Sequence, residues 1–358
     1  SLGDFANIFQ HAFGIQGVVP NNEAIVSVAQ KSFGKEMAMI MFFAMVINIM
    51  IARFTPWKFI FLTGHHTLFM SMMVAVILAT AGMTGVTLIA VGSLVVGVAM
   101  VFFPAIAHPY MKKVTGSDDV AIGHFSTLSY VLAGFIGSKF GNKEHSTEDM
   151  NVPKSLLFLR DTPVAISFTM SIIFLVTCLF AGADAVKELS GGKNWFMFSI
   201  MQSITFAAGV YIILQGVRMV IAEIVPAFKG ISDKLVPNAR PALDCPVVFP
   251  YAPNAVLVGF LSSFAAGLIG MFTLYLLNMI VIIPGVVPHF FVGAAAGVFG
   301  NATGGRRGAI LGAFAQGLLI TFLPVFLLPV LGDIGFANTT FSDADFGALG
   351  ILLGIIVR

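Results

Sequence analysis

Long apolar runs constrain the fold of this chain more than any other feature, because several are close to the length that crosses a bilayer. Examples are residues 37–52, 88–103, 164–180 and 256–282. In hydrocarbon the backbone must satisfy its own polar groups, which leaves helices and closed barrels. The alternating pattern of barrel strands is absent from the sequence. A span takes roughly 20 apolar residues, so we predict an all-α polytopic membrane protein with about eight to ten helical spans and further broken segments.

Composition supports the membrane class and excludes others. The chain is 58% hydrophobic and only 10% charged, against about 25% charged in soluble domains. The net charge of +2, without a basic run that contains aromatics, excludes nucleic acid as a partner. Cys178 and Cys245 lie in or near apolar segments without metal-ligand spacing and are interpreted as reduced packing residues. The lipid bilayer is the expected surrounding, with no cofactor and no metal.

One polar interruption lies inside sequence that hydropathy alone would assign to continuous membrane. Residues 54–73 contain Pro56, Gly64, His65, His66 and Thr67. A broken helix buried in protein exposes backbone groups and a dipole end, which is how transporters build a polar site at bilayer depth. Histidine within a membrane is also a functional-site hypothesis by default. We therefore predict a buried site for a polar solute here.

Further polar candidates lie in other short, broken segments. His124 belongs to residues 120–130, which are too short and too polar for an ordinary span. Asp244 stands among four prolines and would be costly to bury without a purpose. Asn22 and Glu23 follow Pro20 in a corresponding turn. The alternatives are satisfied core histidines, and helix capping by Asp244 and Glu23.

Charge and proline positions predict the ends of several helices. The loop of residues 139–160 has the most basic residues, which by the positive-inside rule makes it the best cytoplasmic candidate. We expect Pro104 and Pro109 to break the span at 88–103, and Pro226 to end the span that begins near residue 195. His289, beside Pro288 in another proline-broken segment, is either a site residue or an interfacial one.

Short motifs recur in the same order in two halves of the chain. The pairs are 14–21 with 230–238, 56–65 with 284–289, 103–104 with 323–324, and 117–119 with 342–345. Repeated halves with broken segments at matching positions are typical of transporters with a site between the repeats. We predict a first repeat at 1–145 and a second at 146–358, which together form one membrane domain. The spans at 164–180 and 195–214 have no counterpart in the first half, which predicts N-terminal helices outside this numbering.

A family resemblance rests on motifs spread over nearly the whole chain. They are Leu62-Thr63-Gly64-His65, Ile122-Gly123-His124, Gln215-Gly-Val-Arg218 with Ala222-Glu223, Ala227-Phe-Lys-Gly-Ile-Ser232, and Leu243-Asp244-Cys245 with Ala252-Pro-Asn-Ala-Val256. With these motifs the chain resembles the membrane EIIC component of the ascorbate-specific phosphotransferase system, the ascorbate permease of the ascorbate–galactitol branch.

The resemblance implies a multi-pass homodimer of the bacterial inner (plasma) membrane. It implies inverted repeats, a dimerising scaffold domain and a mobile core domain with an elevator-type movement. L-ascorbate would enter and leave as its 6-phosphate, with the phosphoryl group passed from phosphoenolpyruvate through EI, HPr and EIIA to the EIIB cysteine. On this interpretation no residue of this chain is phosphorylated, and EIIB docks at its cytoplasmic face.

The resemblance also implies the site residues. The substrate-binding candidates are His65, His124 and Asp244, with the turn of Asn22 and Glu23 as a further wall. Family members have glutamines after both Gly-His pairs, whereas this chain has His66 and Thr67 after the first and Phe125 after the second. We therefore add His66 and Thr67 to the predicted substrate-binding residues.

Other functions make different predictions. An ion-coupled secondary transporter of a related sugar acid or polyol would bind protons or sodium at Asp244, Glu23 and the histidines, and would work without EIIB. An intramembrane enzyme would need a motif that the sequence lacks, such as the His-Glu-x-x-His zinc arrangement. A channel does not account for paired broken helices.

Overall fold

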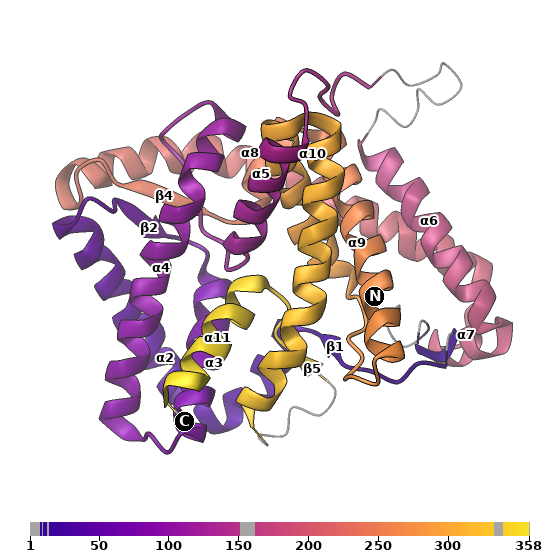
Figure 1. Ribbon diagram of the computed structural model, residues 1–358, viewed down its shortest axis with the longest axis horizontal. Coiled ribbons are helices and arrows are strands. Elements are labelled where there is room, and N and C mark those ends of the chain that lie inside the picture. The colour runs from indigo at the N-terminus through magenta and orange to yellow at the C-terminus, as the bar shows by residue number, and fades with distance from the viewer. Residues whose placement is uncertain (1–7, 9, 13, 151–161, 333–338, 358) are drawn as a thin grey trace.

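The computed structural model describes residues 1–358 except 1–7, 9, 13, 151–161, 333–338 and 358. In the first part of the chain (Figure 1), the elements are β1 (Val19–Pro20), α2 (Asn22–Phe54), β2 (Phe59–Phe61), α3 (Gly64–Thr80), α4 (Gly85–Thr115), β3 (Ala121–Ile122) and α5 (Thr127–Phe140). The later elements are α6 (Thr162–Ala181), α7 (Ala183–Leu189), α8 (Trp195–Leu235), β4 (Arg240–Leu243), the 3-10 helix η2 (Cys245–Tyr251), α9 (Pro253–Leu276), α10 (Val286–Leu331), β5 (Thr339–Thr340) and α11 (Ala344–Val357).

Apolar helices of bilayer-crossing length dominate the described residues. Five are long and apolar enough to cross, or six if the bent pair α6 and α7 forms one span. A straight α10 would measure about 70 Å, more than twice the hydrocarbon thickness. Its conformation breaks at Gly304 and Gly305, and Gly305 has a φ of 60° that favours glycine. These elements confirm the expected polytopic class, but the described residues hold five or six such spans rather than the eight to ten expected.

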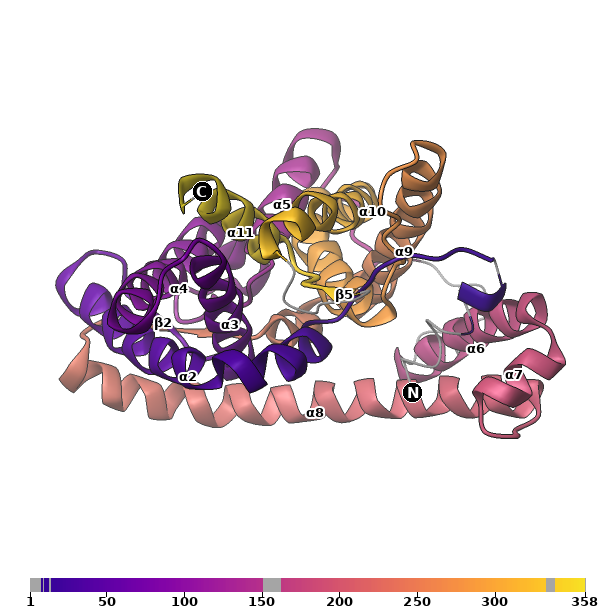
Figure 2. The same cartoon turned by 90° about the horizontal axis from the view of Figure 1, so that it is seen from below.

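Two of the expected helix ends are wrong. α4 continues through Pro104 and Pro109 to Thr115, and α8 continues through Pro226 to Leu235. Proline removes one helical hydrogen bond, but in membrane proteins neighbouring groups and small local adjustments satisfy the freed carbonyl. Figure 2 shows α8 running along one side of the molecule, with α6 and α7 at one end of it.

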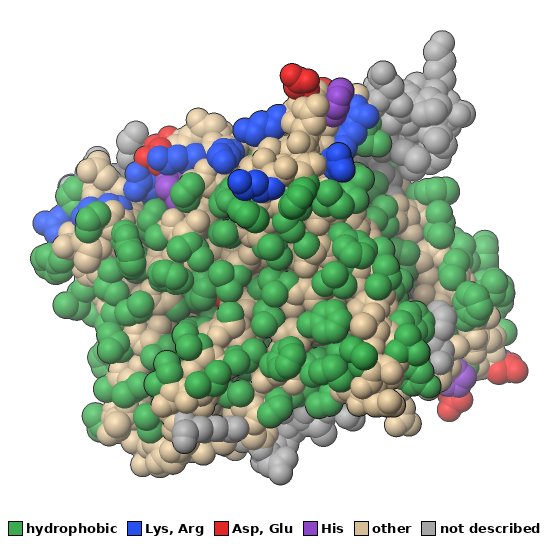
Figure 3. Space-filling model, viewed as in Figure 1, with side chains coloured by type: hydrophobic (Ala, Val, Ile, Leu, Met, Phe, Trp, Pro, Cys, Tyr) green, Lys and Arg blue, Asp and Glu red, His purple; other side chains and the backbone are tan. Residues whose placement is uncertain are grey.

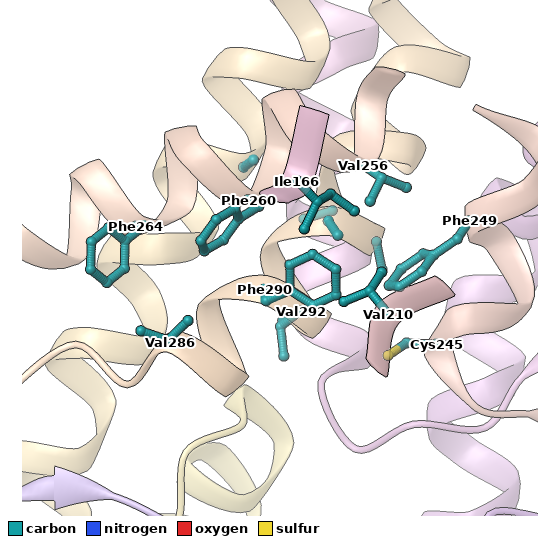
Figure 4. Close-up of a cluster of buried hydrophobic side chains, with 14 of the residues drawn as sticks. Ile166, Val210, Cys245, Phe249, Val256, Phe260, Phe264, Val286, Phe290 and Val292 are labelled. Atoms are coloured by element: carbon teal, nitrogen blue, oxygen red, sulfur yellow. The ribbon is translucent and has the colours of Figure 1, made fainter. Parts of the chain in front are cut away.

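Two buried apolar clusters hold the helices together. The first joins α5, η2, α9 and α10 to α6 and α8, and Figure 4 shows the rings of Phe249, Phe260 and Phe290 within it. The second joins α2, α3, α4 and α11. α9 and α10 pack backbone to backbone, since a Cβ atom on Gly297 would come within 2.6 Å of the Gly259 Cα. The small residues of α9 and α10 therefore allow the two helices to approach closely.

Two small parallel sheets hold the non-helical segments inside the helical structure. β4 lies between β2 and β3, with Phe61 beside Ala242 and Ile122 beside Leu243. β1 pairs with β5 and so joins the two ends of the chain. Non-helical backbone at membrane depth must be bonded by protein, and these ladders provide the partners. Each strand in the described part of the chain is followed within a few residues by a polar residue considered below.

Basic residues gather at one edge of the molecule. In Figure 3 the Lys and Arg side chains follow the upper edge. The last turn of α4 carries Lys112 and Lys113, and the last turn of α5 carries Lys139. The loop after α5 packs onto the break in α10, where the Arg306 N–H donates to the His145 carbonyl at 2.7 Å. By the positive-inside rule this is the expected cytoplasmic edge.

Candidate functional site

The three-stranded sheet brings the predicted polar residues together. β2 leads through Thr63 and Gly64 to His65, β3 leads through Gly123 to His124, and β4 leads directly to Asp244. All three strands are parallel. The carboxyl ends of parallel strands meet at one edge of a sheet, which is where such folds bind ligands. Segments some 60 and 180 residues apart therefore meet around a single cluster.

Asp244 forms the accessible side of this cluster. Its Oδ2 lies 3.5 Å from the His65 Nε2, and its Oδ1 lies 3.8 Å from the His124 Nε2. The Asp244 side chain is 37% exposed and that of His65 is 54% exposed. Oδ1 also accepts from the Cys245 N–H at 2.7 Å, so Asp244 caps η2 as well. The capping alternative is confirmed, and it leaves Oδ2 available to a ligand.

His124 occupies the buried centre of the cluster. Its Nδ1 lies 2.7 Å from the hydroxyl of Tyr130, which is itself fully buried. The other ring nitrogen, Nε2, faces Asp244 at 3.8 Å and Asp343 at 3.9 Å. A hydrogen bond at one nitrogen fixes the ring orientation and directs the second nitrogen toward its neighbours. His124 is therefore held with Nε2 toward two carboxylates.

His66 lies beside His124 and is also buried. The two ring centroids are 4.0 Å apart, and the His66 ring stacks on Phe346 at 5.7 Å. The Phe125 backbone N–H donates to the His66 Nδ1 at 3.3 Å. A ring nitrogen that accepts this bond carries no proton, so in the neutral ring Nε2 is a hydrogen-bond donor. The Phe125 side chain points elsewhere, stacking on Phe61 at 4.6 Å.

Asp343 is the member of the cluster that the sequence interpretation missed as a site residue. It follows β5, and its Oδ2 accepts from the Asn22 amide at 2.7 Å and from the Ser342 hydroxyl at 2.8 Å. Asn22 in turn accepts from the Ser342 N–H at 2.9 Å. The only local signal was the pair of acidic residues, Asp343 and Asp345, before the closing apolar run.

Two other predicted site residues require separate description. The Thr67 hydroxyl is buried and donates to the Thr63 carbonyl at 3.1 Å, within the first turn of α3. Glu23 belongs to the first turn of α2, and its side chain lies outside the described residues. The predicted roles of both in substrate binding stay predictions.

The hydrogen bonds of Asp345 join the N-termini of two short helices, α5 and α11, beside the cluster. Its carboxylate accepts from the Thr127 N–H at 2.8 Å and from the Leu128 N–H at 2.9 Å. Its own N–H donates to the Phe125 carbonyl at 3.0 Å. Free N–H groups and the positive dipole end of a helix both favour a carboxylate. The first turn of α11 therefore caps α5.

His289 lies apart from this cluster although it follows a comparable break. Its Nδ1 is 2.8 Å from the Ser263 hydroxyl, and its ring packs edge-on against Phe264 at 5.9 Å. A Cβ atom on Gly267 would meet the His289 ring at 2.5 Å, so the ring fills the space beside that glycine. His289 is a buried residue between α9 and α10 rather than the interfacial one considered from the sequence.

The cluster has ligand types that could hold a metal ion. The possible sets are His65 with His66 and Asp244, His66 with His124 and Asp343, and His124 with Asp244 and Cys245; within each set the ligand atoms lie within 4.8 Å of one another. The hydrogen bond at the His66 Nδ1 argues against the first two sets, because a metal at Nε2 would have to displace a proton. The alternating donors and acceptors of the cluster also suit a hydroxyl-rich solute.

Ion pairs close the opposite end of the same sheet, near the basic edge. Asp118, just before β3, binds the Arg240 guanidinium at the start of β4 and lies 2.6 Å from the Lys112 ammonium. Burial favours the protonated form of Asp118, but the hydrogen bonds from Arg240, Lys112 and His108 outweigh it and lower its pKa. The strands are thus anchored by charge at one end and carry the polar cluster at the other.

An apolar groove lies elsewhere on the molecule. Its volume is about 750 Å³, and its lining comes from α6 and α8, with Phe168, Ile204 and Tyr211 among the side chains. None of its lining residues belongs to the polar cluster. A surface of this kind between apolar helices suits lipid or another helix better than a polar solute.

Comparison with known proteins gives two matches. The family model EIIC-GAT, described as PTS system sugar-specific permease component, matches residues 1–345. A curated Mycoplasma pneumoniae protein named "Ascorbate-specific PTS system EIIC component" is 30% identical over 265 residues. That match covers 65% of this chain and 38% of the relative, so the match extends over less than half of that relative's length.

Proposed function

Because the chain belongs to the EIIC-GAT family of sugar-specific permease components, we propose that it binds L-ascorbate and carries it inward across a bacterial inner membrane. The family supports a multi-pass membrane protein that transports sugar in the phosphotransferase system. The identity of the substrate and the direction of its transport are our proposal. The observation that carries the proposal is the meeting of His65, His124 and Asp244 at the ends of three parallel strands.

The chemistry of L-ascorbate matches the groups in the cluster. The substrate is a mono-anionic lactone with several hydroxyl groups. Its ring oxygens need donors, which His66 Nε2 supplies and His65 can supply from the accessible side. Its hydroxyl groups need acceptors, and the carboxylates of Asp244 and Asp343 are the strongest available. The Mycoplasma pneumoniae relative bears the name of the same substrate.

The proposed coupling to phosphorylation takes place between substrate and EIIB. The S–P bond of the EIIB phosphocysteine breaks and an O–P bond forms at the substrate's 6-hydroxyl. The cysteine leaves as a thiolate and takes up the proton of that hydroxyl, directly or through water. EIIB is recharged through EIIA, HPr and EI at the expense of phosphoenolpyruvate. The chain itself is not phosphorylated in this scheme. EIIB would dock at the basic edge formed where α4 and α5 end.

We also propose a homodimer with inverted repeats at 1–145 and 146–358 and elevator-type movement of a core domain against a scaffold domain. The proposal is supported by α5 and α11, which are 14-residue helices from different halves whose N-termini meet through Asp345. Helices that begin inside the membrane around one site are typical of transporters with repeated halves.

Binding to the purified protein tests the substrate directly. We expect isothermal titration calorimetry in detergent, without EIIB, to detect L-ascorbate and to give much weaker or no heat with galactitol and dehydroascorbate. The Asp244→Asn variant keeps the side-chain shape and removes one charged acceptor, so its affinity should fall about tenfold. A folded protein that binds galactitol and not ascorbate would overturn the proposed substrate.

An ion-coupled secondary transporter of a sugar acid or polyol is the second candidate. It is favoured by two carboxylates around His124 that, among the described residues, have no Lys or Arg within 4.0 Å. Such a site could take a proton or sodium ion. Uptake of ascorbate by cells that lack EIIB, with collapse of uptake when the ion gradient is removed, would favour this candidate over phosphorylation-coupled transport.

A further inference from the structure

We propose that Asp343 binds the substrate and selects for its hydroxylated side chain, a role that deepens the proposed function and rests on it. Asp343 lies at the buried end of the cluster and is only 6% exposed, opposite the accessible side formed by His65 and Asp244. A ligand that enters past Asp244 therefore meets Asp343 last.

The two oxygens of Asp343 have different surroundings. Oδ2 accepts from Asn22 at 2.7 Å and from the Ser342 hydroxyl at 2.8 Å, and this pair fixes the carboxylate plane. Oδ1 faces the His124 Nε2 at 3.9 Å, which is beyond hydrogen-bond distance. In the described part of the chain no donor bonds to Oδ1. This oxygen faces the polar cluster and can accept a hydrogen bond from a ligand.

Electrostatics decides which part of the substrate can donate a hydrogen bond to the Asp343 Oδ1. No Lys or Arg among the described residues lies within 4.0 Å of Asp343 to offset its charge. The ring oxyanion of ascorbate would be repelled by a carboxylate, whereas a hydroxyl can donate to it. We place the ring oxyanion toward the His66 Nε2 donor and the diol side chain at C5 and C6 toward Asp343. The 6-hydroxyl would leave Asp343 before phosphoryl transfer from EIIB.

Asn22 is the positioning residue for this contact. It starts α2 directly after β1, and its amide bonds Asp343 and Ser342 directly after β5. Asn22, which the sequence placed at the wall of the site, would thus affect the substrate by positioning the Asp343 carboxylate. Its side-chain oxygen accepts from the Ser342 N–H, so the amide orientation that donates to Asp343 is fixed at both ends.

The Asp343→Asn variant changes the group that the ligand meets. Its amide oxygen would take the position that accepts from Asn22 and Ser342, because an amide NH₂ there would face another donor. The NH₂ group would then replace Oδ1 beside His124. The variant keeps the shape of the side chain and replaces the acceptor in the site by a donor.

The test compares L-ascorbate with its 5-deoxy and 6-deoxy analogues by calorimetry on wild type and Asp343→Asn. We expect the variant to lose about tenfold or more in affinity for ascorbate. At least one deoxy analogue should bind the wild type weakly, and for that analogue the variant should lose less than about twofold in affinity. Equal losses for all three ligands, or no loss for ascorbate, would overturn the role of Asp343.

Controls separate folding and substrate identity from this outcome. Asp118→Asn changes a carboxylate at the far end of the sheet and should bind like wild type. If Asp343→Asn is unfolded in thermal melts, Asn22→Ala tests the same contact and should give a smaller loss with the same dependence on the diol. If wild type binds galactitol and not ascorbate, the proposed substrate fails, and galactitol with its 1-deoxy analogue then tests Asp343 by the same comparison.

Discussion

Gly64-His65 follows β2 and Gly123-His124 follows β3, so the same dipeptide ends the two outer strands of one sheet. The first pair is open: nothing lies within 4 Å of a Cβ placed on Gly64, and the His65 side chain is 54% exposed. The second is enclosed: a Cβ on Gly123 would collide with the Ala242 backbone, and the His124 side chain is 5% exposed. Identical local sequence therefore forms an accessible side of the cluster at His65 and its buried centre at His124.

The largest difference is expected for ligand binding by the two histidines. His124→Ala removes a buried group held by Tyr130 and facing two carboxylates, and ascorbate affinity should fall more than tenfold. His65→Ala removes an exposed group, whose contacts are typically worth about 0.2–1 kcal/mol, and affinity should fall about two- to fivefold. Calorimetry on both variants measures the contrast. Equal losses of affinity in two variants that melt like wild type would contradict the contrast between an accessible His65 and a buried His124.

The two glycines should respond to alanine with opposite signs in stability. Gly123→Ala places a methyl group against the Ala242 carbonyl, and overpacking of this kind costs about 1–3 kcal/mol. Gly64→Ala adds a methyl group in open space at the start of α3, where the loss of glycine flexibility in the unfolded chain should stabilise by up to about 1 kcal/mol. Thermal unfolding in detergent distinguishes them. A destabilised Gly64→Ala would show that the backbone at Gly64 is as constrained as the backbone at Gly123.

The smallest expected effect concerns the anchor at the other end of β3. Asp118 ties β3 to β4 through an ion pair with Arg240, whereas on the β2 side Arg240 bonds the Lys58 carbonyl and its guanidinium lies over the Phe59 ring. The pKa of Asp118 is lowered in the folded protein, so its contribution is present above the unfolded value of about 3.9 and is lost as pH falls below it. Because the side chain is half exposed, we expect Asp118→Asn to cost about 1 kcal/mol or less at pH 7.

The measurement for this anchor is the melting temperature of wild type and Asp118→Asn at pH 7, 5 and 3. The difference between the two proteins should be constant from pH 7 to 5 and should shrink toward pH 3. A difference that grows as the solution is acidified would contradict the sign of the shift. Ascorbate binding at pH 7 should be the same in both proteins, because the anchor lies away from the polar cluster.

The breaks in the helices were predictable to different extents. Residues 56–65 and 241–253 were correctly taken as interruptions, because clustered prolines and polar residues act locally. Pro104, Pro109 and Pro226 were wrongly taken as helix ends, since a single proline in a membrane helix is satisfied by neighbours that the local sequence does not reveal. The same limit applies to His289, whose environment depends on Ser263 and Gly267 of another helix.

The sequence by itself determined the class of the protein and most of the residues considered for the site. Hydropathy fixes the membrane environment, and a histidine or carboxylate inside it marks a functional position, because burying it unpaired is costly. The tertiary structure decided which of these residues meet. Asp343 lies beside His124 because β5 pairs with β1, across more than 300 residues, and because Asp345 bonds the first turn of α5. His66 becomes a donor at Nε2 because Phe125 bonds its other ring nitrogen. Strand pairing over such distances depends on the packing of the whole chain, which no local pattern contains.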